Sequence, residues 1–411
     1  MFINYGKKSR INAKYMDNIK NSLNPKHYGK NTLLDNLLGA LFCIYILSGW
    51  IGYVNSVNRV VTIANLIWIV TGLLLLMIET LSFKKQYKFT YQLVGILLLG
   101  FLLNSLVRSN TSVFLLARPL SNVGIALFLL RKKLASFVLP FIYLVFAFVC
   151  SYFIYFIIYR GIDPNKIFLL SSRNLVSILL IYYSAILYII NDKVGFGKPI
   201  LPAAVTLILS VVSYGRSGII SSFFLITGIL LLNSSEKRKS TEFNIFIVLC
   251  GIVFLTFIVA NRADITKIIN NITHYFQYLE LKGLADKDGR ELIWRRYIRS
   301  IDWVGFIFGS DAKYASSVVG FGGNYHNSFL DLHADFGISG IIYMCLLLNA
   351  MLKLFNLNRL LLLILVTIVM RLSTDSFLFQ SQYSFTVFYI TFYAFKAREL
   401  CPDDVQKGRV T

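Results

Sequence analysis

A glycine-rich polar run meets a strongly apolar segment within residues 320–340, and His326-Asn327 lies at the junction. At helical period, a helix that begins near Asn324 or Tyr325 carries His326 and His333 on one face and runs straight towards a membrane span. An imidazole beside a membrane titrates near neutral pH and can accept a proton from a hydroxyl group as a general base. The alternative for His326 is a capping or interfacial histidine.

The histidines and aspartates of this stretch also raise the question of a metal ion. His326 and His333 would lie about 10 Å apart along a helix axis, which is too far for both to bind one ion. Asp331 and Asp335 have the spacing of a helical metal pair, but their face lies away from that of His326. We therefore expect neither a metal ion nor a cofactor.

Arginines form the second group of candidates. Arg216 stands in the turn SYGRSG, where glycines let backbone approach a ligand and a guanidinium can hold a phosphate through two hydrogen bonds. Arg290 opens the helical stretch RELIWRRYIRS, and Arg295 lies broadly on the same face. Each has an ordinary alternative: Arg216 can reach from the end of a membrane span to the surface, and Arg290 and Arg295 can form a solvated basic face.

Two further arginines fall within apolar segments, where a charge is costly and the default interpretation is functional. Arg371 has Asp375 one turn later, so an intrahelical ion pair is the competing explanation. Arg118 precedes Pro119, and this pair can also mark a helix kink.

Composition identifies the class of protein. The 411 residues are 56% hydrophobic with a mean hydropathy of +0.65, which is too apolar for a soluble chain of this length. Beside membrane spans, the net charge of +21 sets orientation and favours anionic headgroups, so we expect no nucleic acid partner. The five cysteines stand singly and form no disulfide framework. GxxxxGK[ST] and GxGxxG motifs are absent, which argues against a nucleotide as sugar donor or energy source.

We predict an all-α, polytopic membrane fold of about twelve transmembrane helices. The predicted spans are residues 33–53, 60–81, 89–107, 112–130, 134–159, 172–191, 198–214, 217–233, 242–260, 337–355, 359–375 and 381–396. Lys and Arg concentrate in short cytoplasmic loops, and one side of this arrangement carries 24 of them against 6 on the other. Both termini are therefore predicted to be cytoplasmic.

The spans divide the chain into a cytoplasmic basic tail (1–32), nine transmembrane helices (33–260), a periplasmic loop (261–336), three further transmembrane helices (337–396) and a cytoplasmic tail (397–411). The loop is the unusual connection. It carries Lys or Arg at nine positions and many aromatic residues, including Trp294, Tyr297 and Trp303, too many for a solvated linker. We predict that it folds as a small helical cap over the outer membrane surface.

At GRSG (215–218), GRELIW (289–294) and HNSFLDLHADFGISG (326–340), the chain resembles the bacterial O-antigen polymerase and O-antigen ligase superfamily. The shared features are an outer arginine after a mid-chain span, a long periplasmic loop with a GRxxxW-like stretch, and a His-Asn helix that runs into the next span. The likeness covers roughly residues 200–350, whereas residues 1–190 match only as a set of apolar spans. HNSFLDLHADFG is closer to the polymerases than to the ligases.

The resemblance implies a GT-C-like protein of the bacterial inner membrane that performs inverting, metal-independent glycosyl transfer at the periplasmic face. Donor and acceptor would be oligosaccharides linked to undecaprenyl diphosphate, with membrane lipids and a chain-length regulator protein as further partners. His326 would act on the acceptor hydroxyl, with Asn327 beside it. Arg216 and Arg290 would bind the diphosphate, with Arg295 and Arg371 as secondary candidates.

Two alternatives stay open. An O-antigen ligase would move the glycan to lipid A-core and would use the same residues. A polysaccharide flippase belongs to a different class, in which transporters tend towards two similar halves. The halves of this chain differ, because its long loop follows the ninth predicted span.

Overall fold

The computed structural model describes residues 32–54, 58–81, 88–108, 113–168, 173–236, 289–310, 325–379 and 381–399, and the regular structure within these ranges is helical. The first part of the chain forms α2 (Leu33–Val54), α3 (Asn58–Leu81), α4 (Lys88–Arg108), α5 (Val113–Arg131), α6 (Val138–Phe153), the π-helical turn η2 (Ile154–Tyr159), the short 3₁₀ turn η3 (Pro164–Lys166), α7 (Asn174–Val194), α8 (Leu201–Val212) and α9 (Arg216–Glu236). The second part forms α12 (Gly289–Ser300), α13 (Trp303–Phe308), α15 (Ser328–Phe336), α16 (Ile338–Leu357), α17 (Arg359–Leu372), η4 (Gln382–Ser384) and α18 (Phe385–Glu399).

Within the described residues, seven helices are long and apolar enough to cross a membrane: α2, α3, α5, α6 with η2, α7, α9 and α16. They identify an all-helical membrane protein. Every predicted span except 242–260 falls on a helix. Residues 242–260 lie outside the described residues, as do the tails 1–31 and 400–411. The count of twelve spans therefore stays a prediction.

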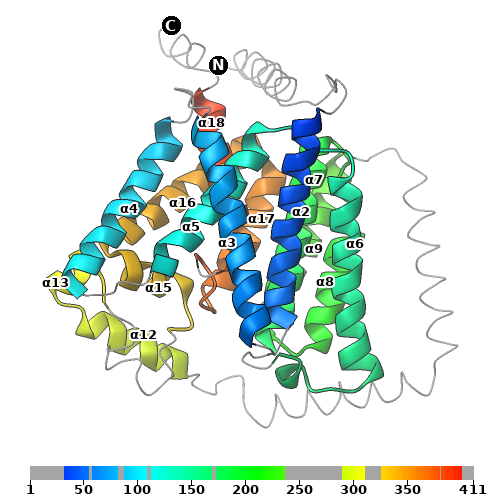
Figure 1. Cartoon of the computed structure of the whole chain (residues 1–411). Coiled ribbons are helices and arrows are strands. Elements are labelled where there is room, and N and C mark those ends of the chain that lie inside the picture. Colours follow the sequence, from blue (N-terminus) through cyan, green and yellow to red (C-terminus); the bar gives the residue numbers. More distant parts are fainter. Residues whose placement is uncertain are drawn as a thin grey trace, which may run out of the picture.

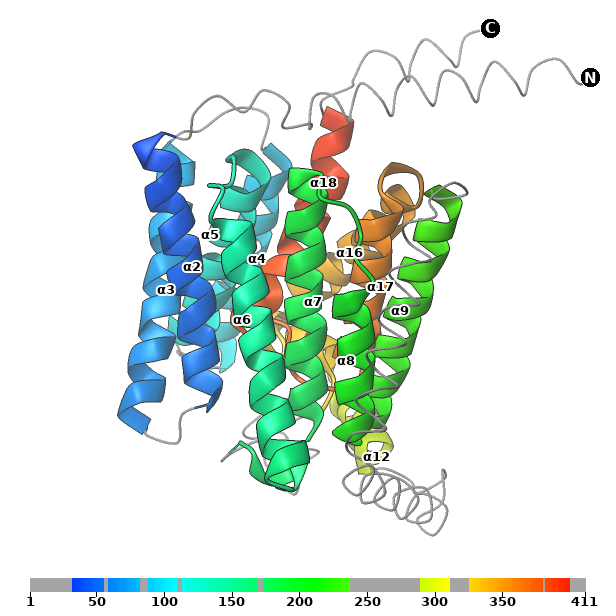
Figure 2. The same ribbon diagram turned by 90° about the vertical axis from the view of Figure 1, so that its right-hand side faces the viewer.

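Helix α7 forms the centre of the bundle. In the most apolar part of α7, 94% of the residues are buried. The helices that pack around α7 are α6, α8, α9, α17 and α18. Figure 2 shows α7 between α6 and α8. A hydroxyl pair, Ser184 with Thr206 of α8, closes this interface at 2.7 Å. Such side-chain hydrogen bonds hold helices together where lipid offers no polar partner.

The bundle has two distinct ends. Helix α2 begins and α18 ends at one of them, whereas α12 and α13 lie at the other, which we call the loop end (Figure 1). Successive helices run in opposite directions through the bundle. As a result, α7 and α9 begin at the loop end and α17 ends there. The starts of α7 and α9 therefore meet the turn that follows α17.

The loop helices are packed onto the bundle through α4. The side-chain amide of Asn104 donates to the carbonyl oxygens of Phe308 (2.7 Å) and Ala334 (3.0 Å). These bonds fix the ends of α13 and α15 against α4. The described part of the predicted cap is thus helical and in contact with the membrane helices.

Gly337 separates α15 from α16. Its φ is +56°, and a β-carbon at this position would lie 2.2 Å from the carbonyl oxygen of Ile307. Only glycine fits this combination of left-handed backbone and close contact. The prediction of one helix running straight from the histidine into the membrane span is therefore wrong, because the chain turns at Gly337.

Helices α17 and α18 are shorter than their predicted spans. Helix α17 has 14 residues, about 21 Å at 1.5 Å per residue, against the roughly 30 Å of a bilayer core. The two helices are joined by residues 373–384, of which Leu378, Phe379 and 381–384 are buried among the described positions. We call residues 373–379 and 381–384 the interior segment. Non-helical backbone at membrane depth is tolerated where it is buried in protein or lines a cavity.

Candidate functional site

His326 lies in a turn before α15 rather than in a helix. Its φ is +51°, in the left-handed region that residues other than glycine seldom adopt, and its side chain is half-buried. The helix begins at Ser328, so the predicted start near Asn324 or Tyr325 is wrong and His326 does not share a helical face with His333. Backbone held in such a region clusters at functional sites, since the surroundings must hold it there.

Asn327 explains where the helix starts. Its backbone is extended, and its side-chain oxygen accepts hydrogen bonds from the backbone nitrogens of Phe329 (2.9 Å) and Leu330 (3.3 Å). This is the N-cap arrangement that asparagine favours. Asn327 thereby sets the direction in which the chain leaves the His326 turn, and its side chain is occupied by that role.

Helix α12 holds the other flank of the turn. The indole nitrogen of Trp294 donates to the carbonyl oxygen of Tyr325 at 3.0 Å. The rings of Tyr297 and Tyr325 meet edge to face at 4.6 Å, and both residues are buried. The GRELIW stretch and the His-Asn stretch are therefore in direct contact, and His326 sits between two fixed neighbours.

Arg216 is the first residue of α9, and the turn before it contains Tyr214 with a φ of +59°. The Arg216 side chain is half-buried. A β-carbon at Gly218 would lie 2.1 Å from the hydroxyl of Ser177 on α7. We expected the glycines of this turn to let backbone approach a ligand, but Gly218 instead lets α9 approach α7.

Arg371 joins the helix ends that meet near the interior segment. Its side chain is buried and pairs with the carboxylate of Asp375, as the sequence suggested. It also donates to the hydroxyls of Thr374 (2.7 Å) and Ser217 (2.9 Å) and to the carbonyl oxygen of Asn174 (3.1 Å). Arg371 thus links α17 to the first turns of α7 and α9.

Asp375 continues this link to α15. The hydroxyl of Ser328 donates to the carbonyl oxygen of Asp375 at 2.6 Å. The same hydroxyl accepts from the backbone nitrogens of Phe377 (2.7 Å) and Leu378 (3.0 Å). The first residue of α15 is therefore anchored to the interior segment.

Together these contacts connect the two predicted parts of the site. Ser217 follows Arg216 in the chain, and Ser328 lies two residues after His326. Arg371 contacts Ser217 and Asp375, and Asp375 contacts Ser328. We call this series of contacts the Arg371 link. It connects the Arg216 turn to the His326 turn through one ion pair, in which Arg371 is buried and Asp375 is half-buried.

Asp331 is a further titratable group at the base of the turn. It lies one helical turn after Asn327, is 7% exposed, and its Oδ2 atom has no hydrogen-bond partner among the described residues. Burial raises the pKa of Asp331 to about 7, against the opposing effect of a hydrogen bond from Ser376. Asp331 therefore carries its proton more readily than an ordinary aspartate.

His333 has a different environment from His326. Nε2 lies 3.1 Å from the carbonyl oxygen of Phe306, and Nδ1 lies 2.7 Å from the hydroxyl of Tyr297. A carbonyl can only accept, so Nε2 carries the hydrogen and Nδ1 accepts from Tyr297. Burial lowers the pKa of His333 and favours this neutral form. These contacts give His333 a structural role, since it ties α12 and α13 to α15.

The remaining predicted arginines occupy separate positions. Arg290 lies in the first turn of α12, but its side chain is outside the described part of the chain. Arg295 is exposed on the same helix, and Arg118 is half-buried in α5. Arg371, by contrast, is only 1% exposed, so its guanidinium faces protein groups.

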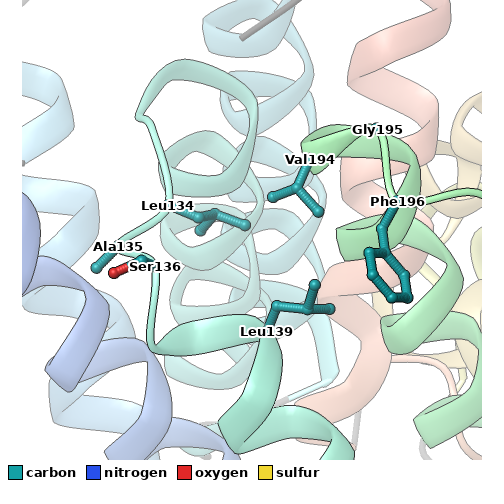
Figure 3. Close-up of a pocket in the computed structure, with 7 residues that line it drawn as sticks. All are labelled: Leu134, Ala135, Ser136, Leu139, Val194, Gly195 and Phe196. Carbon is teal, nitrogen blue, oxygen red and sulfur yellow. The ribbon is translucent and has the colours of Figure 1, made fainter. Parts of the chain in front are cut away.

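An apolar pocket of about 410 Å³ lies at the other end of the bundle (Figure 3). It is formed where α5 turns into α6 and where α7 ends, by Leu134, Ala135, Ser136, Leu139, Val194, Gly195 and Phe196. None of these side chains is titratable. This pocket therefore has no acid or base of its own.

Sequence reasoning missed Ser217, Ser328, Asp331 and the interior segment. Asp331 was considered only as a metal ligand. The signal that could have found the segment was the polar run STDS (373–376) between two apolar stretches. Polar groups at membrane depth are rare and tend to mark functional positions.

No protein-family model matches the chain, and no curated protein matches its sequence.

Proposed function

We propose that the chain is a membrane glycosyltransferase, an O-antigen polymerase, that joins oligosaccharide repeat units carried on undecaprenyl diphosphate at the periplasmic face of the bacterial inner membrane. The observation that carries the proposal is the Arg371 link between the Arg216 turn and the His326 turn. A diphosphate leaving group needs fixed positive charge, and an attacking sugar hydroxyl needs a base. The linked turns supply one of each.

In the proposed reaction, the neutral imidazole of His326 takes the proton of an acceptor hydroxyl as that oxygen attacks the anomeric carbon of the donor sugar. A glycosidic C–O bond forms, and the bond to the diphosphate breaks on the opposite side of the carbon, with inversion. The diphosphate leaves with the electron pair, and Arg216 and Arg290 stabilise its charge. Both substrates are anchored in one membrane, which lowers the entropic cost of bringing them together.

Arg371 has a different part in this proposal. Its hydrogen bonds go to Ser217, Asn174, Thr374 and Asp375, so we assign it as a positioning residue that keeps the two turns in register. The strained backbone of His326, held between Asn327 and Tyr325, supports the same view of a prearranged site.

The test is the surface glycan of a strain from which the protein has been deleted. A single repeat unit on the lipid core supports the polymerase. Polymer retained on the carrier lipid indicates a ligase instead, and repeats trapped at the cytoplasmic face indicate a flippase. An unchanged glycan would contradict all three assignments.

A further inference from the structure

Arg118 is a half-buried charge that the Arg371 link does not use. It lies five residues into α5, within the apolar span that begins at Phe114. Its Nε atom is buried and has no hydrogen-bond partner among the described residues. Arg131, near the other end of the same helix, pairs with Glu79 at 2.7 Å. Of the two arginines of α5, Arg131 is therefore paired with a carboxylate and Arg118 is not, among the described residues. An ionisable residue inside a membrane span marks a functional position by default.

Contacts with the interior segment fix the position of Arg118. One helical turn later, the side-chain amide of Asn122 donates to the carbonyl oxygens of Arg118 (3.0 Å) and Ser381 (3.1 Å). The hydroxyl of Tyr53 contacts that of Ser381 at 3.4 Å, and Tyr53 lies close enough to Arg118 for the two to interact electrostatically. Arg118 and Tyr53 therefore flank the end of the interior segment, whereas Arg371 flanks its beginning.

Tyr182 supplies a second polar group without a partner. The residue is 1% exposed, and no described residue makes a hydrogen bond with its hydroxyl. Its ring stacks on those of Phe377 (6.0 Å) and Tyr383 (5.7 Å), and the ring of Tyr53 stacks on the same two residues. Leaving a buried hydroxyl without a partner is unfavourable, which favours a bound group that accepts its hydrogen bond.

We infer that Arg118, Tyr53 and Tyr182 form a second binding position, for the diphosphate of the lipid-linked acceptor. The Arg118 guanidinium and the Tyr182 phenol can both donate to a ligand, whereas the Tyr53 phenol donates to Ser381 and packs beside them. Phosphate oxygens are strong acceptors that match a guanidinium fork. Arg371 is neutralised by Asp375, but Arg118 has no acidic partner among the described side chains.

This inference rests on the proposed function and makes it more specific. A polymerase handles two lipid diphosphates in one turnover: one leaves, and the other stays attached to the acceptor. Transfer to lipid A-core involves only one such carrier. A diphosphate position beside Arg118, separate from the Arg216 turn, therefore fits the polymerase better than the ligase.

The experiment counts undecaprenyl diphosphate bound to the purified full-length protein in lipid nanodiscs. Wild type is expected to bind two molecules, Arg118→Gln one, and Arg216→Gln one. Pro119→Ala is the matched control, because it changes the neighbouring residue of α5 and keeps the guanidinium; it should bind two. Tyr182→Phe removes only the unpartnered hydroxyl, so it should fold normally and weaken the Arg118-dependent molecule several-fold.

Parallel measurements with phosphatidylglycerol and with inorganic diphosphate separate the sources of the phosphate. Equal Arg118-dependent binding of phosphatidylglycerol would overturn the assignment to the acceptor. Two bound molecules in both Arg118→Gln and Tyr182→Phe, or a single Arg216-dependent molecule in wild type, would overturn the inference alone. A deletion strain with normal glycan would instead overturn the proposed function and leave an Arg118-dependent diphosphate position standing.

Discussion

Arg371 Nη1 lies 2.9 Å from the hydroxyl of Ser217, and this contact joins the end of α17 to the first turn of α9. The same guanidinium pairs with Asp375, whose carbonyl oxygen accepts from Ser328. The Arg371–Asp375 ion pair therefore connects the Arg216 turn to the His326 turn. Its removal should affect both stability and activity, and the two effects can be separated.

We expect Arg371→Met to destabilise the protein by about 3–5 kcal/mol, because it leaves the Asp375 carboxylate without its partner. The double variant Arg371→Met/Asp375→Leu should recover most of this loss, since both charges are then gone. Both variants should make little polymer, as the link to Ser217 is broken. Thermal unfolding of the purified proteins and glycan ladders measure the two quantities. A single variant that unfolds with wild type would show that the pair contributes nothing.

Arginine chemistry gives the second prediction. Arg216→Lys and Arg290→Lys should each lower polymer yield at least about tenfold at normal membrane levels, because a point charge loses the bidentate fork. Arg299→Lys is the matched control, since Arg299 is exposed on the same helix as Arg290 and should tolerate the change. Wild-type ladders from both Arg216→Lys and Arg290→Lys would return these residues to surface and interfacial roles.

Asp331 predicts a pH dependence. Burial raises its pKa from 3.8 to about 7, so the folded state prefers the protonated carboxyl and loses stability as the pH rises from about 4 to 7. At about 1.4 kcal/mol per pKa unit, the loss is at most about 4 kcal/mol. Asp331→Asn removes this titration, so the variant should unfold at a higher temperature than wild type at pH 8 but not at pH 4.

His333 provides the internal check on that measurement. Burial lowers its pKa, so its contribution is present above pH 6.5 and lost as the pH falls below that value. Because His333 is unchanged in Asp331→Asn, its effect cancels in the comparison with wild type. Parallel unfolding curves for the two proteins across this pH range would contradict the assignment for Asp331.

The predicted orientation places the loop end on the periplasmic side of the inner membrane. Ser300 on α12 and Ser136 between α5 and α6 are both exposed and lie at opposite ends of the bundle. In spheroplasts, a membrane-impermeant maleimide should label Ser300→Cys and should label Ser136→Cys only after permeabilisation. Unaltered protein measures the background from the native cysteines. The reverse labelling pattern would place the site in the cytoplasm and remove its lipid-linked donor.

Apolar periodicity predicted the membrane helices because each depends on a local run of residues. The spacing of charges likewise predicted the Arg371–Asp375 pair, although α17 ends at Leu372 and the pair is therefore not intrahelical. By contrast, the observed start of α15 differs from the predicted one, because Asn327 caps the helix. The apolar pattern alone does not show this cap. If Asn327 had been taken as the N-cap, the helix start would have been predicted correctly at Ser328.

The rest of the site depends on contacts between distant parts of the chain. Ser328 meets Asp375 across 47 residues, and Arg371 meets Ser217 across 154. No local pattern encodes such pairs, so nothing in the sequence singled out Ser217 or Ser328. The left-handed backbone of His326 was also hidden, because it results from fixing Tyr325 and Asn327 on both sides.

The most direct measurement of the central claim is polymer formation by purified protein from undecaprenyl-diphosphate-linked repeat units, with His326 replaced. His326→Asn is the sharpest variant, because asparagine tolerates a left-handed backbone and a loss of activity is then not due to strain. Loss of a general base should slow the reaction about 10²- to 10⁴-fold. His333→Ala should lower the unfolding temperature with a milder effect on rate, and EDTA should have none. Full-length polymer from His326→Asn, or activity that EDTA removes and a divalent ion restores, would contradict the account.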